Sequence, residues 1–333
     1  MYNAMISKRS MHALRGALLC AACLTVAPVT VQAQPGFPGK VVKVVVPFPA
    51  GGSADVLARI VSDKLSTKWG QPVVVENRAG AGGNIGAEAV YRADPDGYTL
   101  LSSPPGPLSI NHNLYKNLPF DPAKFVPITV LAIVPNVISV KAELPVNSVK
   151  ELIAHAKASP GKITYASQGN GSTSHLSAQM FSSMAGVELV HVPYKGEGPA
   201  LVDIVAGRVD MFIGNIAAGL RFHQAGKVRF LAVANTHRSP VAQDIPTASE
   251  AGLPGFVANA WFALVAPPGT PNTIAQQINA AAVEAIRLPD VQKRFLEQGA
   301  EPVGNTTAEM AAFVKDEMAR WQSVIRTANV TLQ

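Results

Sequence analysis

The apolar positions along the chain alternate between two spacings, one typical of strands and one typical of helices. Residues 41–46 form an apolar run, residues 47–53 form a turn rich in glycine, and residues 55–69 place apolar side chains at helical spacing. This order predicts a strand followed by a helix. Further strands are predicted at residues 73–75, 98–101, 163–166, 189–192, 209–213, 228–234 and 261–266, and further helices at 148–157, 172–185 and 199–206. The alternation predicts an α/β fold built on parallel strands.

The end of the chain has a different pattern. Three helical stretches, at residues 271–287, 289–298 and 307–328, follow one another without an intervening strand. We expect these helices to lie across the outside of an earlier domain, so the chain leaves one domain, builds a second and returns. The predicted lobes are residues 34–135 with 259–333, and residues 136–258, joined by two hinge crossings.

The first 33 residues have the pattern of a secretory signal peptide. Lys8, Arg9 and Arg15 precede an apolar stretch at residues 16–27, and a small-x-small site ends at Ala33. We expect cleavage after Ala33 and export to the periplasm. A lipid anchor on Cys23 is the alternative.

Composition excludes several classes of protein. Only 15% of residues are charged and 48% are hydrophobic, which argues against a disordered or nucleic-acid-coating chain. Lysines and arginines are scattered, so no nucleic-acid partner is predicted. Cleavage would lower the formal net charge from +6 to +3 and remove both cysteines, Cys20 and Cys23. No later segment has eighteen uninterrupted apolar residues, so we expect a soluble mature protein.

Two loops that link a strand to a helix are the strongest candidates for a binding site. The first consists of Pro49, Ala50, Gly51, Gly52 and Ser53, and the second contains Gln168, Gly169, Gly171, Ser172 and Thr173. Glycine allows close backbone approach, and a helix N-terminus presents unpaired amides and partial positive charge. Both loops therefore suit an anion. Alternatively, they are tight turns with Ser53 and Ser172 as N-caps.

Signals for cofactors and catalysis are weak. The third glycine loop, residues 80–86, lacks the G-x-G-x-x-G spacing of a dinucleotide site, and the histidines show no metal-binding spacing, so no cofactor or metal is predicted. Ser172, His175 and Asp210 leave a secreted serine-type hydrolase as the alternative function, although no nucleophile elbow is present.

Three further side chains have two interpretations each. Asp55 lies in the first turn of a helix, where it offsets the dipole or binds a substrate ammonium. His175 is a helix-end cap or polar wall residue, or it contacts the ligand. Lys195 follows Tyr194 after a strand, where it either steers anions at the rim of a cleft or is an ordinary solvated lysine.

Several strings together resemble the Bug family of periplasmic solute-binding proteins, the receptors of tripartite tricarboxylate transporters. They include VVVPFPAGGSAD at residues 44–55, GQPVVVENR at 70–78, GAGGNIG at 80–86, HVPYKG at 191–196 and APPGTP at 266–271. The resemblance runs from about residue 37 to the C-terminus. It implies a two-lobed type II periplasmic-binding fold with a ligand cleft between the lobes.

The resemblance also implies a function and partners. Residues 49–53 would hold one carboxylate and residues 169–173 would serve the other lobe, with a small and a large membrane subunit as partners. Apart from the resemblance, a sensor kinase is the alternative partner, and we expect a monomer. Further matched positions place Tyr194, Lys195, Asp210 and Asn215 in the predicted site. Two departures fall at the cleft: Gly214 replaces an acidic residue that commonly precedes Asn215, and the segment around Ser103 is rich in proline.

The sequence therefore predicts a receptor without enzymatic activity. Its ligand is expected to be a small carboxylate: a dicarboxylate, a tricarboxylate, an acidic amino acid or an aromatic acid. The sequence leaves open whether the receptor feeds transport or sensing.

Overall fold

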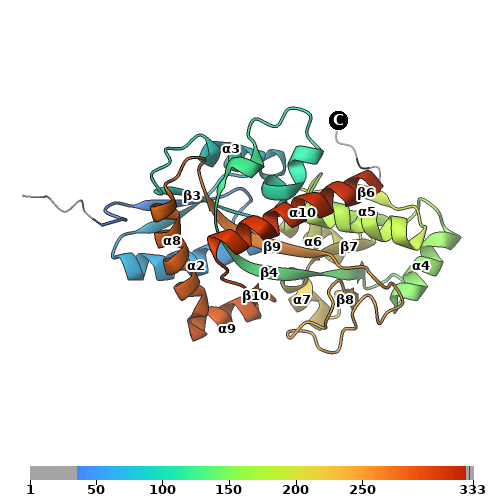
Figure 1. Cartoon of the computed structure of the whole chain (residues 1–333). Coiled ribbons are helices and arrows are strands. Elements are labelled where there is room, and N and C mark those ends of the chain that lie inside the picture. The colour runs from blue at the N-terminus through green and yellow to red at the C-terminus, as the bar shows by residue number, and fades with distance from the viewer. Residues whose placement is uncertain (1–35, 328–329, 331–333) are drawn as a thin grey trace, which may run out of the picture. The chain divides into compact units, whose positions relative to one another are not determined.

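The computed structural model describes residues 36–327 and residue 330, drawn as coloured ribbon in Figure 1. The predicted signal peptide and its cleavage site lie outside the described residues. From Phe37 onward the chain forms one compact unit. In the part of the chain that the structure describes, no helix has the length and apolar character needed to span a bilayer.

Strands and helices alternate along the chain, as the sequence predicts. The strands are β1 (Val42–Val46), β2 (Val73–Asn77), β3 (Thr99–Ser103), β4 (Val126–Lys141), β5 (Thr164–Ser167), β6 (Val190–Pro193), β7 (Met211–Asn215), β8 (Val228–Val233), β9 (Asn259–Ala266) and β10 (Glu301–Pro302). The helices are α2 (Ser53–Trp69), α3 (Asn84–Tyr91), α4 (Val149–Ala158), α5 (Thr173–Ala185), α6 (Glu197–Val205), α7 (Ile216–Gln224), α8 (Asn272–Arg287), α9 (Pro289–Glu297) and α10 (Thr307–Thr327). The short turns are η1 (Ala81–Gly83), η2 (Gly106–Ile110), η3 (Asn111–Asn113) and η4 (Pro122–Lys124).

The strands form a sheet with the order β2-β1-β3-β9-β4-β7-β5-β6, and β8 and β10 both pair with β4. β1 pairs in parallel with β2 and β3, and β5 pairs in parallel with β6 and β7. β4 and β9 run antiparallel to their neighbours. The prediction of parallel strands is therefore correct for the βα units and wrong for the strands that connect them.

Strand β4 joins two halves of this sheet, and its partners change along its length. Up to Pro135 it pairs with β9, and from Asn136 onward it pairs with β7. We call β1, β2, β3, β9 and β10 with their helices the first half, and β5 to β8 with theirs the second half. β4 runs through the centre of Figure 1 between them.

Each half has its own hydrophobic core because its strands are covered on both faces. In the first half, α2 and α8 pack against one face, and α3 covers part of the other. The helix boundaries follow the sequence signals. Gly70 ends α2 with a left-handed φ of 62°, a conformation that costs glycine little. Ser148 caps α4 by accepting a hydrogen bond from the Glu151 amide at 3.2 Å.

The C-terminal helices pack on the first half, and α10 also reaches the second. α8 and α9 pack on α2, whereas α10 contacts η2, β4 and α5. Its buried Glu317 accepts hydrogen bonds from the indoles of Trp261 and Trp321 at 2.8 and 2.9 Å. These hydrogen bonds attach helix α10 to β9, the strand by which the chain returns to the first half.

Candidate functional site

A cavity of about 470 Å³ is lined by residues of both halves. The N-terminal ends of four helices, α2, α5, α6 and α7, contribute to its wall. Ala260 and Phe262 of β9 and the end of α9 complete the lining from the first half. Because a helix start carries partial positive charge and, where no side chain caps it, unpaired amides, this convergence favours a bound anion.

The loop before α2 is open to such an anion. Gly52 is the N-cap residue, and no side chain caps the first turn. Gly51 has a left-handed φ of 85°, which turns the chain into the helix. A Cβ added at Gly52 would meet nothing closer than the Pro49 carbonyl oxygen, 3.9 Å away.

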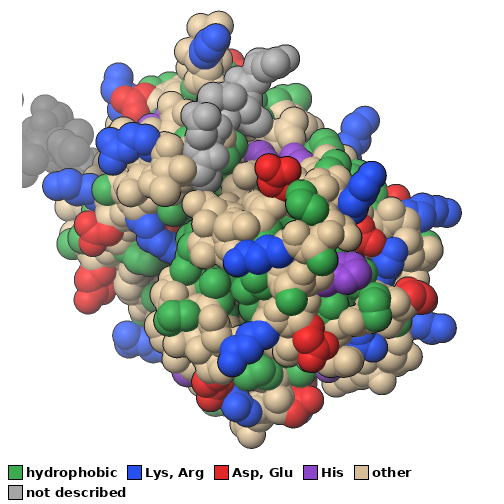
Figure 2. Space-filling view, turned by 90° about the vertical axis from the view of Figure 1, so that its right-hand side faces the viewer, with side chains coloured by type: hydrophobic (Ala, Val, Ile, Leu, Met, Phe, Trp, Pro, Cys, Tyr) green, Lys and Arg blue, Asp and Glu red, His purple; other side chains and the backbone are tan. Residues whose placement is uncertain are grey.

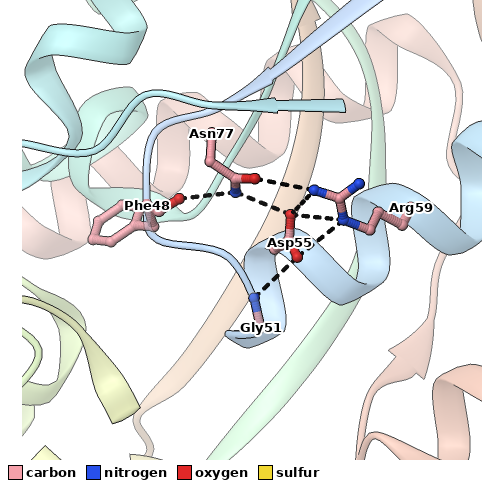
Figure 3. Close-up of polar contacts among 5 residues, drawn as sticks. All are labelled: Phe48, Gly51, Asp55, Arg59 and Asn77. Atoms are coloured by element: carbon pink, nitrogen blue, oxygen red, sulfur yellow. Dashed lines mark hydrogen bonds and ion pairs between the residues drawn. The ribbon is translucent and has the colours of Figure 1, made fainter. Parts of the chain in front are cut away.

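Asp55 holds this loop in place, as Figure 3 shows. Its carboxylate accepts hydrogen bonds from the Gly51 amide at 3.0 Å, from Asn77 Nδ2 at 2.9 Å and from Arg59 Nε at 3.0 Å. Asn77 Nδ2 also donates to the Phe48 carbonyl at 3.0 Å. Burial would raise the pKa of Asp55, but the hydrogen bonds from Arg59, Gly51 and Asn77 outweigh it and hold the pKa below its ordinary value. Asp55 is buried and does not line the cavity, so its role is to position the loop.

The loop before α5 differs from the first because its own side chains occupy its amides. Ser172 Oγ accepts from the His175 amide at 3.4 Å, and Ser174 Oγ accepts from the Gln168 amide at 2.8 Å. The Gly171 amide donates to His175 Nδ1 at 3.2 Å. The two loops share a strand-to-helix design, but the α2 end leaves more of its first turn available.

His175 is buried below the second loop and does not line the cavity. Its ring stacks on His191 with centroids 4.0 Å apart, and His191 Nε2 lies 2.6 Å from Ser167 Oγ. Burial, with a contribution from His191, lowers the pKa of His175 to about 3, and burial lowers the pKa of His191 to about 4. Both imidazoles are therefore neutral at physiological pH and support the loop from beneath.

Three other predicted residues have structural partners of their own. Tyr194 donates its hydroxyl to Asp203 at 2.7 Å, and Ser103 Oγ donates to the Pro104 carbonyl at 2.9 Å. Asp210 pairs with Lys141 at 2.7 Å and accepts from the Thr164 amide at 2.8 Å. Asp210 precedes β7 whereas Asn215 ends it, so the two lie at opposite ends of that strand.

The predicted site residues thus fall into three groups. Lining the cavity are Pro49, Ala50, Gly51, Gly52, Ser53, Gln168, Thr173, Lys195 and Asn215. Lining a small adjoining cavity of about 20 Å³ are Gly169 and Ser172, with Gln168 and Thr173 shared. Lining neither are Asp55, Ser103, Gly171, His175, Tyr194 and Asp210.

Glu197, the first residue of α6, also lines the cavity and was not predicted from the sequence. Its carboxylate accepts from Gln168 Nε2 at 3.1 Å and lies 3.4 Å from Ser53 Oγ and 3.5 Å from Asn215 Nδ2. Burial raises the pKa of Glu197 to about 7 in spite of these hydrogen bonds. The signal was available, since Gly196-Glu197 follows a strand and opens a helix just as Gly52-Ser53 does.

The departure at Gly214 has a packing explanation. A Cβ at Gly214 would lie 2.1 Å from the ring of Phe212, which packs in the core of the second half. The ring occupies the space that a side chain at residue 214 would need. Asn215 keeps its place on the cavity wall and donates to Ser53 Oγ at 3.1 Å, a direct contact between the halves.

The triad of the hydrolase alternative is not assembled. Ser172 Oγ donates to the Gly169 carbonyl at 2.6 Å, His175 Nδ1 accepts from the Gly171 amide, and Asp210 is engaged by Lys141. Within residues 36–327, no group of three His, Cys, Asp or Glu side chains is arranged to hold a metal ion. On the face drawn in Figure 2, Lys and Arg side chains are interspersed with acidic and apolar ones.

An α/β fold whose two halves line a ligand-sized cavity is typical of solute-binding proteins. The chain belongs to the tripartite tricarboxylate transporter family receptors, which it matches over residues 57–330. This confirms the resemblance to the Bug proteins, and because the family consists of receptors it also confirms the expectation that the chain is not an enzyme.

Similar proteins cover almost all of the chain. Protein BugT of Bordetella pertussis is 40% identical over 309 residues, covering 92% of this chain and 94% of BugT. Among solved structures, "R. palustris Rpa4515 with adipate" is 40% identical with a TM-score of 0.86, covering 89% of this chain and 100% of that one. "MatC (Rpa3494) from Rhodopseudomonas palustris with bound malate" is 35% identical with a TM-score of 0.82, covering 87% and 100%.

Proposed function

We propose that this protein is an exported receptor that binds a small carboxylate in the cavity between its two halves. The observation that carries the proposal is the convergence of four helix N-termini on one cavity of about 470 Å³. Adipate and malate, bound by the two R. palustris proteins, are both small dicarboxylates, which supports the same class of ligand here.

The proposed ligand contacts come from both halves. Residues 49–53 at the start of α2 would hold one carboxylate, with the backbone amides of Gly52 and Ser53 donating to it, because no side chain caps this helix and the Gly51 amide is bonded to Asp55. Gln168, Thr173 and Asn215 would contact the ligand from the second half, and the exposed Lys195 would attract anions at the rim.

The proposed lobes are residues 34–135 with 259–333, and residues 136–258. The change of partners along β4 between Pro135 and Asn136 supports this division. In the proposal the lobes close on the ligand by bending at the two crossings, one in β4 and one before β9.

We further propose that the chain acts in the periplasm as a monomer after cleavage behind Ala33, and delivers its ligand to the membrane subunits of a tripartite transporter. A sensor kinase is the alternative partner. An intact mass that begins at Gln34 would support this processing, and a diacylglyceryl mass on Cys23 would contradict it.

A thermal unfolding panel tests the carboxylate proposal. A ligand present at about 100 times its dissociation constant adds about 2.7 kcal/mol to the free energy of unfolding, which raises the melting temperature by several degrees. Di- and tricarboxylates should raise it, and the matching carboxamides should not. If uncharged sugars raise the melting temperature while carboxylates do not, the proposal is wrong.

A further inference from the structure

Glu197 places a carboxyl group inside a cavity that otherwise suits anions. It is half-buried at the start of α6, and the residues around its carboxylate, Ser53, Gln168 and Asn215, all line the same cavity. Acidic residues often occupy the first turn of a helix because they offset its dipole. Such residues usually point to water, whereas this carboxylate faces the cavity.

The carboxylate has hydrogen-bond donors but no cation. Its three side-chain neighbours are a hydroxyl and two amides, and among the described residues it takes part in no ion pair. Lys195 and Arg221 line the cavity too, but both are exposed residues at its rim. The charged form of a carboxyl group withdrawn from water is normally paired with an opposite charge, so a bound cationic group would favour ionised Glu197.

The position of Glu197 relative to α2 defines what that partner must be. Ser53, 3.4 Å from the carboxylate, is the first residue of α2, where the ligand carboxylate is proposed to bind. A cationic group beside Glu197 would therefore lie next to the ligand carboxylate, as the ammonium does in a 2-amino acid.

We propose that Glu197 determines specificity by accepting the ammonium group of a ligand whose adjacent carboxylate binds at the start of α2. The ligand class is then amino acids that carry both groups on one carbon, in preference to plain dicarboxylates. A plain dicarboxylate would bring a second negative charge next to Glu197 with no cation between them, and like charges at this separation repel. This inference rests on the proposed carboxylate receptor.

The test uses pairs of probes that differ only in the ammonium group: aspartate with succinate, glutamate with glutarate, and 2-aminoadipate with adipate. One of these pairs should match the length of the cavity. In calorimetric titration, the amino acid of that pair should bind at least about tenfold more tightly than the dicarboxylate, because it gains a charge-assisted hydrogen bond. Glu197→Gln should remove this preference by weakening the amino acid and strengthening the dicarboxylate.

Two further variants control the test. Glu188→Gln makes the same change at an exposed residue outside the cavity and should keep the wild-type preference. Glu197→Asp keeps the carboxyl group on a shorter side chain and should retain part of the preference for the amino acid. Circular dichroism and urea unfolding establish that each variant is folded.

The other outcomes count against the inference in distinguishable ways. If wild-type protein binds the dicarboxylate as tightly as the amino acid, or if Glu197→Gln leaves the preference intact, Glu197 does not set specificity and the carboxylate receptor stands. If neither member of any pair binds while an uncharged compound does, both the inference and the proposed function are wrong.

Discussion

Asp55 shows how one buried side chain can prepare a binding loop without touching a ligand. It connects the Gly51 amide to Arg59 and Asn77, so the turn before α2 is held on two sides. Its partners donate to both carboxylate oxygens, and Asp55 does not line the cavity, so it is not placed to bind a ligand ammonium. The sequence left two roles open for Asp55, and its contacts favour the one at the start of the helix over binding of a substrate ammonium.

Replacing Asp55 by Ala should lower the free energy of unfolding by about 2–3 kcal/mol, since hydrogen bonds to a charged group are lost. Ligand affinity should also fall, because the Gly51 turn loses its support. Arg59→Ala is the control: the Arg59 side chain is 47% exposed, so its loss should cost at most about 1 kcal/mol. Urea unfolding measures both, and equal losses would show that Asp55 has no special role.

The effect of Asp55 should depend on pH. Its pKa is lowered in the folded chain, so it stabilises the fold above the unfolded value of about 3.9 and loses this effect as pH falls through the folded pKa. The gap between wild type and Asp55→Ala should therefore narrow below about pH 4. A gap that stays constant down to pH 3 would contradict the assigned hydrogen bonds.

Glu197 has the opposite pH behaviour. Its pKa is raised to about 7 in the folded chain, above the value of about 4.3 for an unfolded Glu. Between about pH 4.3 and pH 7, therefore, Glu197 is protonated in the folded chain and ionised in the unfolded chain. This stabilisation is complete below about pH 4 and is lost as pH rises through 7. Without ligand, wild type should become less stable relative to Glu197→Gln between pH 5 and pH 8. Urea unfolding of both proteins at pH 5 and pH 8 measures this change, and a wild type that gains stability relative to Glu197→Gln would contradict it.

At the scale of elements, the start of α2 is the part of the site that can be altered most cleanly. Gly52→Asp adds a side chain where space is open and φ is −81°, so no backbone strain is introduced. Aspartate is also a better N-cap than glycine, so the unliganded fold should be as stable as wild type or slightly more stable. Carboxylate affinity should fall at least about a hundredfold, or about 2.7 kcal/mol, since the new carboxylate occupies the amides and repels the ligand.

Gly52→Asn is the matched control for this variant. It has nearly the same shape and also caps the helix, but it carries no charge, so its loss of affinity should be clearly smaller. Titration calorimetry distinguishes the two, and near-wild-type affinity in Gly52→Asp would remove this loop from the site. Gly171→Asp is less informative, because Gly171 has a φ of 76° and its amide already bonds to His175.

Helix α10 should depend on one buried carboxylate. Glu317→Ala leaves the indole N–H groups of Trp261 and Trp321 without their acceptor, which should cost about 2–4 kcal/mol of stability. Asp316→Asn changes an exposed acidic residue one position earlier and should cost less than about 0.5 kcal/mol. A similar melting temperature for the two variants would show that the indoles do not depend on Glu317.

The βα units could be predicted from sequence because each is local: an apolar run, a glycine turn and a helix follow one another. Strand β4 could not, since its 16 residues contain two prolines and pair with strands from both halves. Helices α3 and α7 were also missed, because each follows directly on a segment interpreted as a loop or strand. The contacts of Glu197 depend on three residues from separate segments, and no spacing along the chain reveals them.

In the whole molecule, β4, β9 and helix α10 join the two halves, each of which has its own core. Ser53 and Asn215 meet across the cavity at 3.1 Å, and Glu197 lies beside both. A ligand bound between the halves would replace or reinforce the contacts among Ser53, Asn215 and Glu197. Ligand binding would thereby change how the two halves are held together.

The central claim is that the cavity selects a carboxylate, and native mass spectrometry tests it most directly. Wild-type protein and Gly52→Asp are each mixed with an equimolar pool of carboxylates, their uncharged amides and simple sugars, and the mass of the complex identifies what is bound. We expect one carboxylate per wild-type chain and no complex with Gly52→Asp. Capture of an uncharged member of the pool by wild type, or equal capture of the carboxylate by both proteins, would contradict it.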